Sequence, residues 1–567
     1  MNQLGGFPLL TLIVFLPLLG AAAVGCVPRA PAGREDAVRW LAFLIAAAVF
    51  FVALFLYMGW VDDPAGTLQF VDGPWPWVPD LGVQYHLGID GIGLHFALLS
   101  TLLTPLALWL AWPQLTRSQA AGMLLVEAGV LGAIASFDMV LWVAFWLLAM
   151  LATPLAGGGI NAEAQRRGGT QRGDRAAGQP GSREQPWGGT WFWIAMAVAA
   201  ACMLAVLAGL SARQAGFGLF DLLANPPGWE AQAWPFWGLA CALGITGVVF
   251  PLFWQGGIQR AASPAASMLI GALLPNLGVY GFIRLGLALF PLAAVSFAPA
   301  MVLLGAAGML YGALAALGAA SWPATLACWN MSQVGLSLVG IFAMQDLGVH
   351  GAVAHLFGRG VSAAALAVLA GALTPNPSPS SLPTFQPSDV GRGERAMAAL
   401  GFLSALGVPG LAGFVGQGMV VLGMLRWHWQ VSASRAVNRW LDWALYLAVA
   451  LGLLVGAWAL LRAWRGMGRR TPDRAARTPA GRARVRQALV AIPLLIAIFL
   501  FGLRPQGFSD MTGPAVYRLL SDVDAGVRAS LQRMASESLS DPVLLGGEEA
   551  GLPLPGQGPA PGTARDE

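Results

Sequence analysis

The chain has 567 residues, of which 57% are hydrophobic and 11% are charged, whereas a soluble domain carries about 25% charged residues. This composition excludes a soluble globular protein. The formal net charge of +4 does not indicate nucleic-acid binding, because the arginines lie in short loops between apolar runs. All 32 basic side chains are arginine, and lysine is absent.

Apolar runs long enough to cross a hydrocarbon core of about 30 Å recur along the chain. They do not alternate polar and apolar residues, so they predict helices rather than strands of a barrel. No cleavage site with a soluble domain follows the first run, which we therefore interpret as a membrane helix and not as a signal peptide. The sequence predicts an all-α polytopic membrane protein with about fourteen helices, at residues 7–27, 40–60, 89–112, 119–136, 138–156, 190–210, 235–254, 264–284, 299–319, 325–343, 351–373, 396–425, 441–462 and 487–504.

The charges in the loops predict the orientation of these helices. With the first residues outside, the inner loops carry most of the arginines, and the long outer loop 61–88 carries four aspartates and no arginine. This asymmetry follows the positive-inside rule and places both termini outside. We expect a transmembrane domain at 1–504 and an external, partly disordered tail at 505–567, with one surface helix from about 515 to 538. The inner segments 157–189 and 374–395 have compositions typical of disorder.

Two of the predicted helices contain residues that interrupt a helix. Pro275 lies among three nearby glycines, and Pro409 lies in a second glycine-rich segment. Breaks in paired membrane helices point to an ion pathway in transporters. A proline kink that only helps packing explains them equally well.

Six segments carry a resemblance to a known family, in the same order along the chain. They are YHLGIDGIGLHFALLSTLLTPLALW (85–109), LLVEAGVLGAIASFDMVLWVAFW (124–146), LLPNLGVYGFIR (273–284), MLYGALAALGAASWPATLACWNMSQVGLSLVGI (309–341), HGAVAHLFGRGVSAAAL (350–366) and LGVPGLAGFVGQGMV (406–420). They resemble the antiporter-like membrane subunits of respiratory complex I, and among these the chain M or mitochondrial subunit 4 type. Relatives occur in cation/proton antiporters and membrane-bound hydrogenases.

The resemblance implies a fold with two inverted five-helix repeats, whose core covers about 119–425, and with broken helices at Pro275 and Pro409. It also implies a place in the membrane arm of an NADH:quinone oxidoreductase in a bacterial inner membrane. The expected partners are L-, N- and K-like chains and the lipid bilayer, without nucleic acid. We expect no cofactor, no metal and no catalytic centre in this chain.

At the family's proton-channel positions the chain carries neutral residues. The resemblance places the fifth-helix glutamate at Leu147, the seventh-helix lysine near Thr246 and the eighth-helix lysine at Asn276. It places a tenth-helix histidine at Gln333 and the twelfth-helix glutamate at Gln417. None of these side chains exchanges protons near neutral pH. The joint loss of carboxylates and lysines predicts a degenerate channel, because losing only one partner strands a buried charge.

Four ionisable side chains in the matched segments remain candidates for a functional role. Glu127 lies in the middle of an apolar helix, as a proton carrier or as a structural hydrogen-bonding group. Asp138 lies near the outer surface, where we expect it to cap a helix. His355 and Arg359 are four residues apart on one helix face, and a helix-eleven histidine of the family falls on Arg359. His355 is either a proton shuttle or a satisfied polar side chain.

Three hypotheses follow from these residues. The first is a chain M-like subunit with a degenerate channel and a mainly structural role. The second is an active transporter that moves ions by way of Glu127, His355 and Arg359. The third is a subunit of another complex, such as an Mrp-type antiporter or a membrane-bound hydrogenase.

Overall fold

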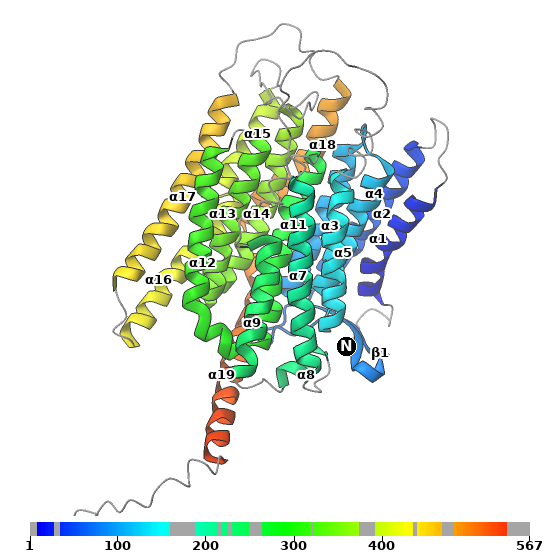
Figure 1. Cartoon of the computed structure of the whole chain (residues 1–567). Helices are drawn as coiled ribbons and strands as arrows, with labels where there is room; N and C mark the ends of the chain where they lie inside the picture. Colours follow the sequence, from blue (N-terminus) through cyan, green and yellow to red (C-terminus); the bar gives the residue numbers. More distant parts are fainter. Residues whose placement is uncertain are drawn as a thin grey trace, which may run out of the picture.

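The computed structural model describes residues 8–27, 35–158, 187–212, 217–224, 229–248, 263–319, 321–373, 392–434, 439–467 and 481–540. Most of these residues are helical, and the long helices run side by side as one bundle (Figure 1). The inner segments for which we expect disorder, 157–189 and 374–395, lie almost entirely outside the described residues, as does the end of the tail.

The N-terminal half of the chain forms a series of helices that is interrupted by one β-hairpin. The elements are α1 (Leu9–Cys26), α2 (Glu35–Met58), β1 (Phe70–Val78), β2 (Val83–Ile89), α3 (Gly91–Ala111), α4 (Arg117–Ala135), α5 (Met139–Gly157), α7 (Trp187–Ser211), α8 (Leu219–Ala224) and α9 (Trp229–Leu243), which continues as the π-helical segment η2 (Gly244–Val248).

The C-terminal half is helical throughout its described residues. It contains α11 (Pro264–Gly281) with the π-helical segment η3 (Phe282–Leu287), α12 (Pro291–Gly318), α13 (Trp322–Phe342), α14 (Asp346–Leu373), α15 (Arg392–Ala405), α16 (Ala412–Ser434), α17 (Arg439–Met467), α18 (Gly481–Leu503) and α19 (Pro505–Ser540).

The described part of the chain has 12 helices that are long and apolar enough to cross a membrane. The two other expected segments are present as α9 with η2, and as the shorter pair α15 and α16. The prediction of an all-α membrane protein with about fourteen membrane helices is therefore confirmed.

Side-chain caps define the start of several helices. Asp90 accepts a hydrogen bond from the Gly93 amide at the start of α3, and Asp138 accepts from the Val140 and Leu141 amides at the start of α5. These bonds satisfy amide groups that have no partner inside the helix. Both aspartates thus hold the helix ends at which the sequence places them.

Small residues allow α12 and α13 to pack closely. A Cβ atom added at Gly312 would lie 2.6 Å from the Ser332 amide nitrogen, and one added at Gly335 would lie 2.6 Å from the Met309 nitrogen. Membrane helices gain no hydrophobic energy by leaving lipid, so close backbone approach is a main source of their packing energy. Alanine at either position would push the two helices apart.

The loop 61–88 forms a structure that the sequence analysis did not predict. Strands β1 and β2 pair antiparallel, with Phe70 opposite Ile89. The buried carboxylate of Asp72 accepts hydrogen bonds from the amide and the hydroxyl of Thr11, at 2.7 and 2.9 Å, so the hairpin is anchored to the start of α1. The acidic residues of this loop therefore help to anchor the hairpin, in addition to their part in the predicted orientation.

The two expected helix breaks differ in the structure. Between α15 and α16 the helix is open, and Gly407 and Gly410 have positive φ angles of 73° and 86° on either side of Pro409. Helix α11, in contrast, continues through Pro275 and widens only afterwards, in η3. Because proline has no N–H, the carbonyl of residue 271 loses its helical donor without the helix ending.

The tail helix α19 begins at Pro505, earlier than the sequence predicts. One face of its first half is buried against the bundle. Phe508 and Met511 are buried where α19 meets α3 and α14. The Thr512 hydroxyl lies 2.8 Å from Nε2 of His350 on α14. The last turns of α19 project beyond the bundle at the end where β1 and α8 lie (Figure 1).

A single glutamine joins α19 to two other helices. Gln232 of α9 accepts hydrogen bonds from the Leu292 and Ala293 amides at the start of α12, at 2.9 and 3.2 Å. Its Nε2 donates to the Ser530 hydroxyl of α19 at 3.0 Å. This contact fixes the second half of α19 against the bundle.

Candidate functional site

The centre of the candidate site is the guanidinium group of Arg359 on α14, which is only 1% exposed. Its Nη1 donates to the Gly271 carbonyl and to Oδ1 of Asn330, each at 3.2 Å. Its Nη2 donates to Oδ1 of Asn276 and, at 3.5 Å, to the Ala272 carbonyl. Arg359 thus joins α11, α13 and α14 in the interior of the bundle.

The sequence around Pro275 explains why oxygen atoms are available to Arg359. Pro275 cannot donate to the Gly271 carbonyl, and the Arg359 guanidinium takes the place of that missing donor. Asn276, the next residue, adds its side-chain oxygen and donates from Nδ2 to the Leu356 carbonyl at 3.1 Å. Within the described residues, no carboxylate forms an ion pair with Arg359, so its charge is held by neutral oxygens alone.

A second polar group, around His355, lies one turn before Arg359 on α14. Nε2 of His355 lies 3.1 Å from the Gln333 carbonyl oxygen on α13. The Gln333 side chain in turn accepts from Nε2 of Gln417 on α16, also at 3.1 Å. Three residues that the sequence analysis singled out separately are therefore one hydrogen-bonded cluster.

The two candidate positions in the N-terminal half lie on η2 and α5. Thr246 lies in η2, and its hydroxyl donates to the Ala242 and Leu243 carbonyls of its own helix, at 3.2 and 3.0 Å. Leu147 is half-buried on α5 and supplies only apolar contacts. Neither side chain can bind and release a proton.

Glu127 is fully buried in the middle of α4. The Thr104 hydroxyl of α3 lies beside it but donates to the Ser100 carbonyl at 3.0 Å. The chain contains no lysine that could pair with this carboxyl group. Within the described residues no hydrogen bond joins Glu127 to the Arg359 cluster, and both of its buried carboxyl oxygens lack a hydrogen-bond partner there.

Asp138 is a structural carboxylate at the outer end of α5. It accepts hydrogen bonds from three backbone amides, those of Gln84, Val140 and Leu141, at 3.0, 2.9 and 3.1 Å. Burial raises the pKa of Asp138, and the three amide donors oppose that rise. These contacts occupy the carboxylate and join α5 to the hairpin.

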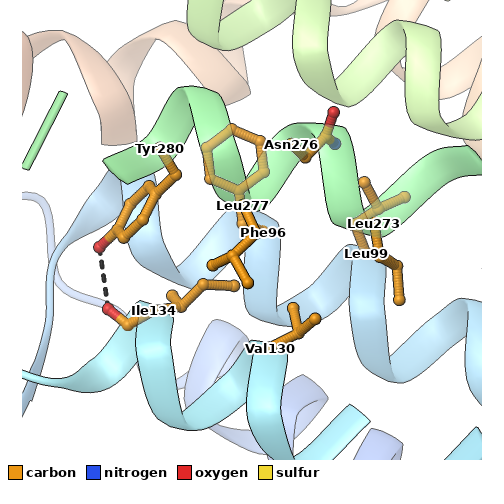
Figure 2. A pocket seen from close by; sticks show the side chains of 8 residues that line it. All are labelled: Phe96, Leu99, Val130, Ile134, Leu273, Asn276, Leu277 and Tyr280. Carbon is orange, nitrogen blue, oxygen red and sulfur yellow. Dashed lines mark hydrogen bonds between the residues drawn. The ribbon is translucent and has the colours of Figure 1, made fainter. Parts of the chain in front are cut away.

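A small cavity lies between α3, α4 and α11, next to Asn276 (Figure 2). Its volume of about 10 Å³ is close to the minimum that one water molecule needs. Figure 2 shows Tyr280 at one end of the cavity and Asn276 on its upper side, with apolar side chains lining the rest. The Tyr280 hydroxyl already donates to the Ile134 carbonyl at 2.8 Å. This cavity is too small and too apolar to hold a chain of water molecules.

Sequence reasoning missed one charged network, which lies at the outer end of α11. Arg284 forms an ion pair with Asp90, the N-cap residue of α3, and its Nε donates to the Tyr280 hydroxyl at 2.9 Å. Arg284 also lies over the ring of Phe137, with 5.2 Å between the guanidinium carbon and the ring centroid. The spacing of four residues between Tyr280 and Arg284 was the available sequence signal.

Comparison with known proteins shows what the chain is similar to. Residues 189–438 match the family described as NADH:quinone oxidoreductase/Mrp antiporter, transmembrane. Two NAD(P)H-quinone oxidoreductase chain 4 proteins of Picosynechococcus sp. are each 29% identical to the chain. One match covers 74% of the chain and 73% of the relative, and the other covers 94% of both.

Solved structures agree with the sequence matches. A chain of respiratory complex I from Thermus thermophilus superposes with a TM-score of 0.73 at 25% identity, covering 91% of this chain and 99% of that one. The chain is therefore similar in sequence to NAD(P)H-quinone oxidoreductase chain 4 proteins and similar in fold to a chain of respiratory complex I. A chain of the Mrp complex from Dietzia sp. shares the fold, with a TM-score of 0.69 at 18% identity over 92% of this chain and 100% of that one.

The chain shares the helical fold of these proteins, and of its two expected helix breaks only the one at Pro409 is open. The sequence analysis expected charge to be lost jointly from the channel. The structure places the charge of Arg359, which the sequence analysis named among the remaining ionisable residues, in the buried interior beside Asn276. The cluster can hold a cation and orient hydrogen bonds, but Asn276, Gln333 and Gln417 cannot relay protons.

Proposed function

We propose that the chain is a chain M-like membrane-arm subunit of a proton-translocating NADH:quinone oxidoreductase, with a mainly structural role and a degenerate proton channel. It docks beside L-, N- and K-like sister chains in a bacterial cytoplasmic membrane, with both termini outside. It carries no redox cofactor of its own. The chain 4 relatives, which align over most of their length, support this assignment over an Mrp-type antiporter.

The observation that carries the structural role is the chemistry of the Arg359 and Gln333 clusters. A proton relay requires groups that bind and release protons under the influence of charged neighbours. The hydrogen bonds here connect an arginine, which stays protonated, to Asn276 and Asn330, and connect His355 to Gln333 and Gln417. One histidine among amides supplies a single proton-binding group and no path.

Proton uptake per electron in reconstituted vesicles, normalised to assembled complex, tests the degenerate channel. We expect Glu127→Gln and His355→Ala, made singly, to leave this ratio unchanged. Asp36→Asn is the matched control, because Asp36 is exposed and its ion pair within the described residues is with Arg39 on its own helix. A clear fall in the ratio for either buried variant, with assembly unchanged, would show that an active, rerouted channel exists.

The membrane-arm assignment has its own test. Blue-native electrophoresis followed by mass spectrometry is expected to find the chain in a large complex with other NADH:quinone oxidoreductase subunits. Co-migration with hydrogenase or Mrp subunits would replace the assignment with the corresponding complex, and migration alone would refute membership of an arm.

A further inference from the structure

The environment of Arg359 has the form of a cation site. Four oxygen atoms surround the guanidinium: the Gly271 and Ala272 carbonyls and the side-chain oxygens of Asn276 and Asn330. All four are neutral, and they come from two helices that Arg359 does not belong to. Neutral carbonyl oxygens that converge on one point replace the hydration shell of a monovalent cation in membrane proteins.

The oxygen atoms are held in place independently of Arg359. The Gly271 carbonyl is free because Pro275 has no N–H, and Asn276 is held by its bond to the Leu356 carbonyl at 3.1 Å. Asn276 and Asn330 are themselves buried, each at most 4% exposed. Removal of the arginine side chain would therefore leave four converging oxygens without a positive charge among them.

We propose that Arg359 is a tethered cation that fills an intramembrane site for monovalent cations and so excludes mobile cations from the middle of the bundle. An arginine in a narrow polar passage repels protons and other cations. Because a guanidinium does not lose its proton at physiological pH, this barrier is permanent. The inference extends the proposed structural role: the passage is closed by a charge as well as lacking a relay.

Chemical rescue tests whether the site exists. We expect Arg359→Ala to lower the thermal stability of the purified complex, and millimolar guanidinium ion to restore it, because the free cation fits the four oxygens. Sodium chloride and urea at the same concentrations separate rescue from ionic strength and from denaturation. Arg504→Ala, at an exposed arginine, is the matched control and should show neither loss nor rescue. An assembled Arg359→Ala complex that guanidinium does not stabilise overturns the proposal.

If Arg359→Ala fails to assemble, variants of Asn276 test the role of the Arg359 charge while the arginine stays in place. Asn276→Asp places an anion against the guanidinium and should assemble at least as well as the wild type. Asn276→Lys buries a second cation there and should reduce assembled complex by at least about tenfold, since an uncompensated buried charge is strongly destabilising. Asn276→Leu controls for the lost hydrogen bonds. Equal assembly of the Asp and Lys variants would show that Arg359 does not act through its charge.

Passive leak measures the barrier itself. Vesicles carrying Arg359→Ala, under an imposed potential and without electron transfer, should conduct monovalent cations several-fold faster than wild-type vesicles, and guanidinium should block that leak. An unchanged leak from a well-assembled variant refutes the barrier. If the chain proves not to be a membrane-arm subunit, the rescue and leak can be measured on the isolated chain, so the two proposals fail separately.

Discussion

At the scale of single residues, the ion pair between Arg284 and Asp90 is the clearest stabilising feature. Both side chains are largely buried, with 16% and 5% of their surfaces exposed, and the Tyr280 hydroxyl accepts from the same guanidinium. Breaking a buried pair by removing one charge leaves the other without compensation, which costs more than the pair itself contributes.

Asp90→Asn isolates this effect, because asparagine caps a helix about as well as aspartate but carries no charge. We expect a loss of about 3 kcal/mol in the free energy of unfolding, seen as a lower melting temperature of the complex. Asp36→Asn, which breaks the exposed pair with Arg39, should cost at most about 1 kcal/mol. Similar losses in the two variants would mean that water screens the buried pair between Arg284 and Asp90.

His86 gives the outer hairpin a predictable pH dependence. It is buried on β2 beside Phe137 and Phe220, and burial lowers its pKa from the ordinary 6.5, although nearby Asp221 opposes the shift. The unfolded chain therefore binds this proton more readily than the folded one. The stability from neutral His86 is present above the ordinary pKa and is lost as the pH falls toward the folded pKa.

We therefore expect His86→Phe to make the hairpin less sensitive to acid between about pH 7 and pH 5. Hydrogen exchange of the β1 and β2 amides across that range measures the difference. Asp63→Asn is the control: hydrogen bonds from Thr67 and Ala65 hold the pKa of Asp63 below 3.8, so it titrates outside this range. An identical pH profile for wild type and His86→Phe would assign the acid sensitivity to another group.

At the scale of elements, α19 acts as part of the bundle. The centroid of the Phe508 ring lies 4.4 Å from that of the His95 ring and 4.8 Å from that of the Phe501 ring, and both pairs have edge-to-face geometry. The Thr512 hydroxyl meets His350, so one face of α19 covers the outer ends of α3 and α14. The other face is exposed, as Tyr517 at 69% shows.

Phe508→Ala should therefore cost about 3–5 kcal/mol, the usual loss for a buried phenylalanine, and should release α19 from α3. Tyr517→Ala removes a ring of similar size from the exposed face of the same helix and should change stability by no more than about 0.5 kcal/mol. Thermal unfolding and proteolysis after residue 504 measure both variants. Equal protection in the two variants would show that the polar contacts of Thr512 and Ser530 hold α19 without the Phe508 ring.

At the scale of the whole molecule, orientation follows from the loop arginines. Reporter insertions at Gly178 and Gly481 should behave as cytoplasmic, because their loops carry the arginine clusters. The external reporter should be inserted at Ala65, which lies in an exposed turn before the hairpin. Gly73 is unsuitable because it lies inside β1 and has a positive φ of 100°. Opposite behaviour at two of the three sites would reverse the topology.

Much of this architecture was determined by the sequence itself, because its causes are local. Length and apolarity decide which segments cross a membrane, and six ordered segments, among them GIDGI around Asp90 and LLPNLGVYGFIR around Pro275, were enough to indicate the family. The Pro409 break was also predictable, since glycines with positive φ at 407 and 410 are needed for the turn.

Only the tertiary structure decided what the polar residues do. Arg359 contacts Asn276 across 83 residues of sequence, and Gln417 contacts Gln333 across 84; nothing local to either pair predicts which helices meet. The same holds for the hairpin held by Thr11 and for α19 held by His350 and Gln232. Asn276 and Arg359 are far apart in the sequence, but packing of α11 against α14 places the arginine charge beside Asn276.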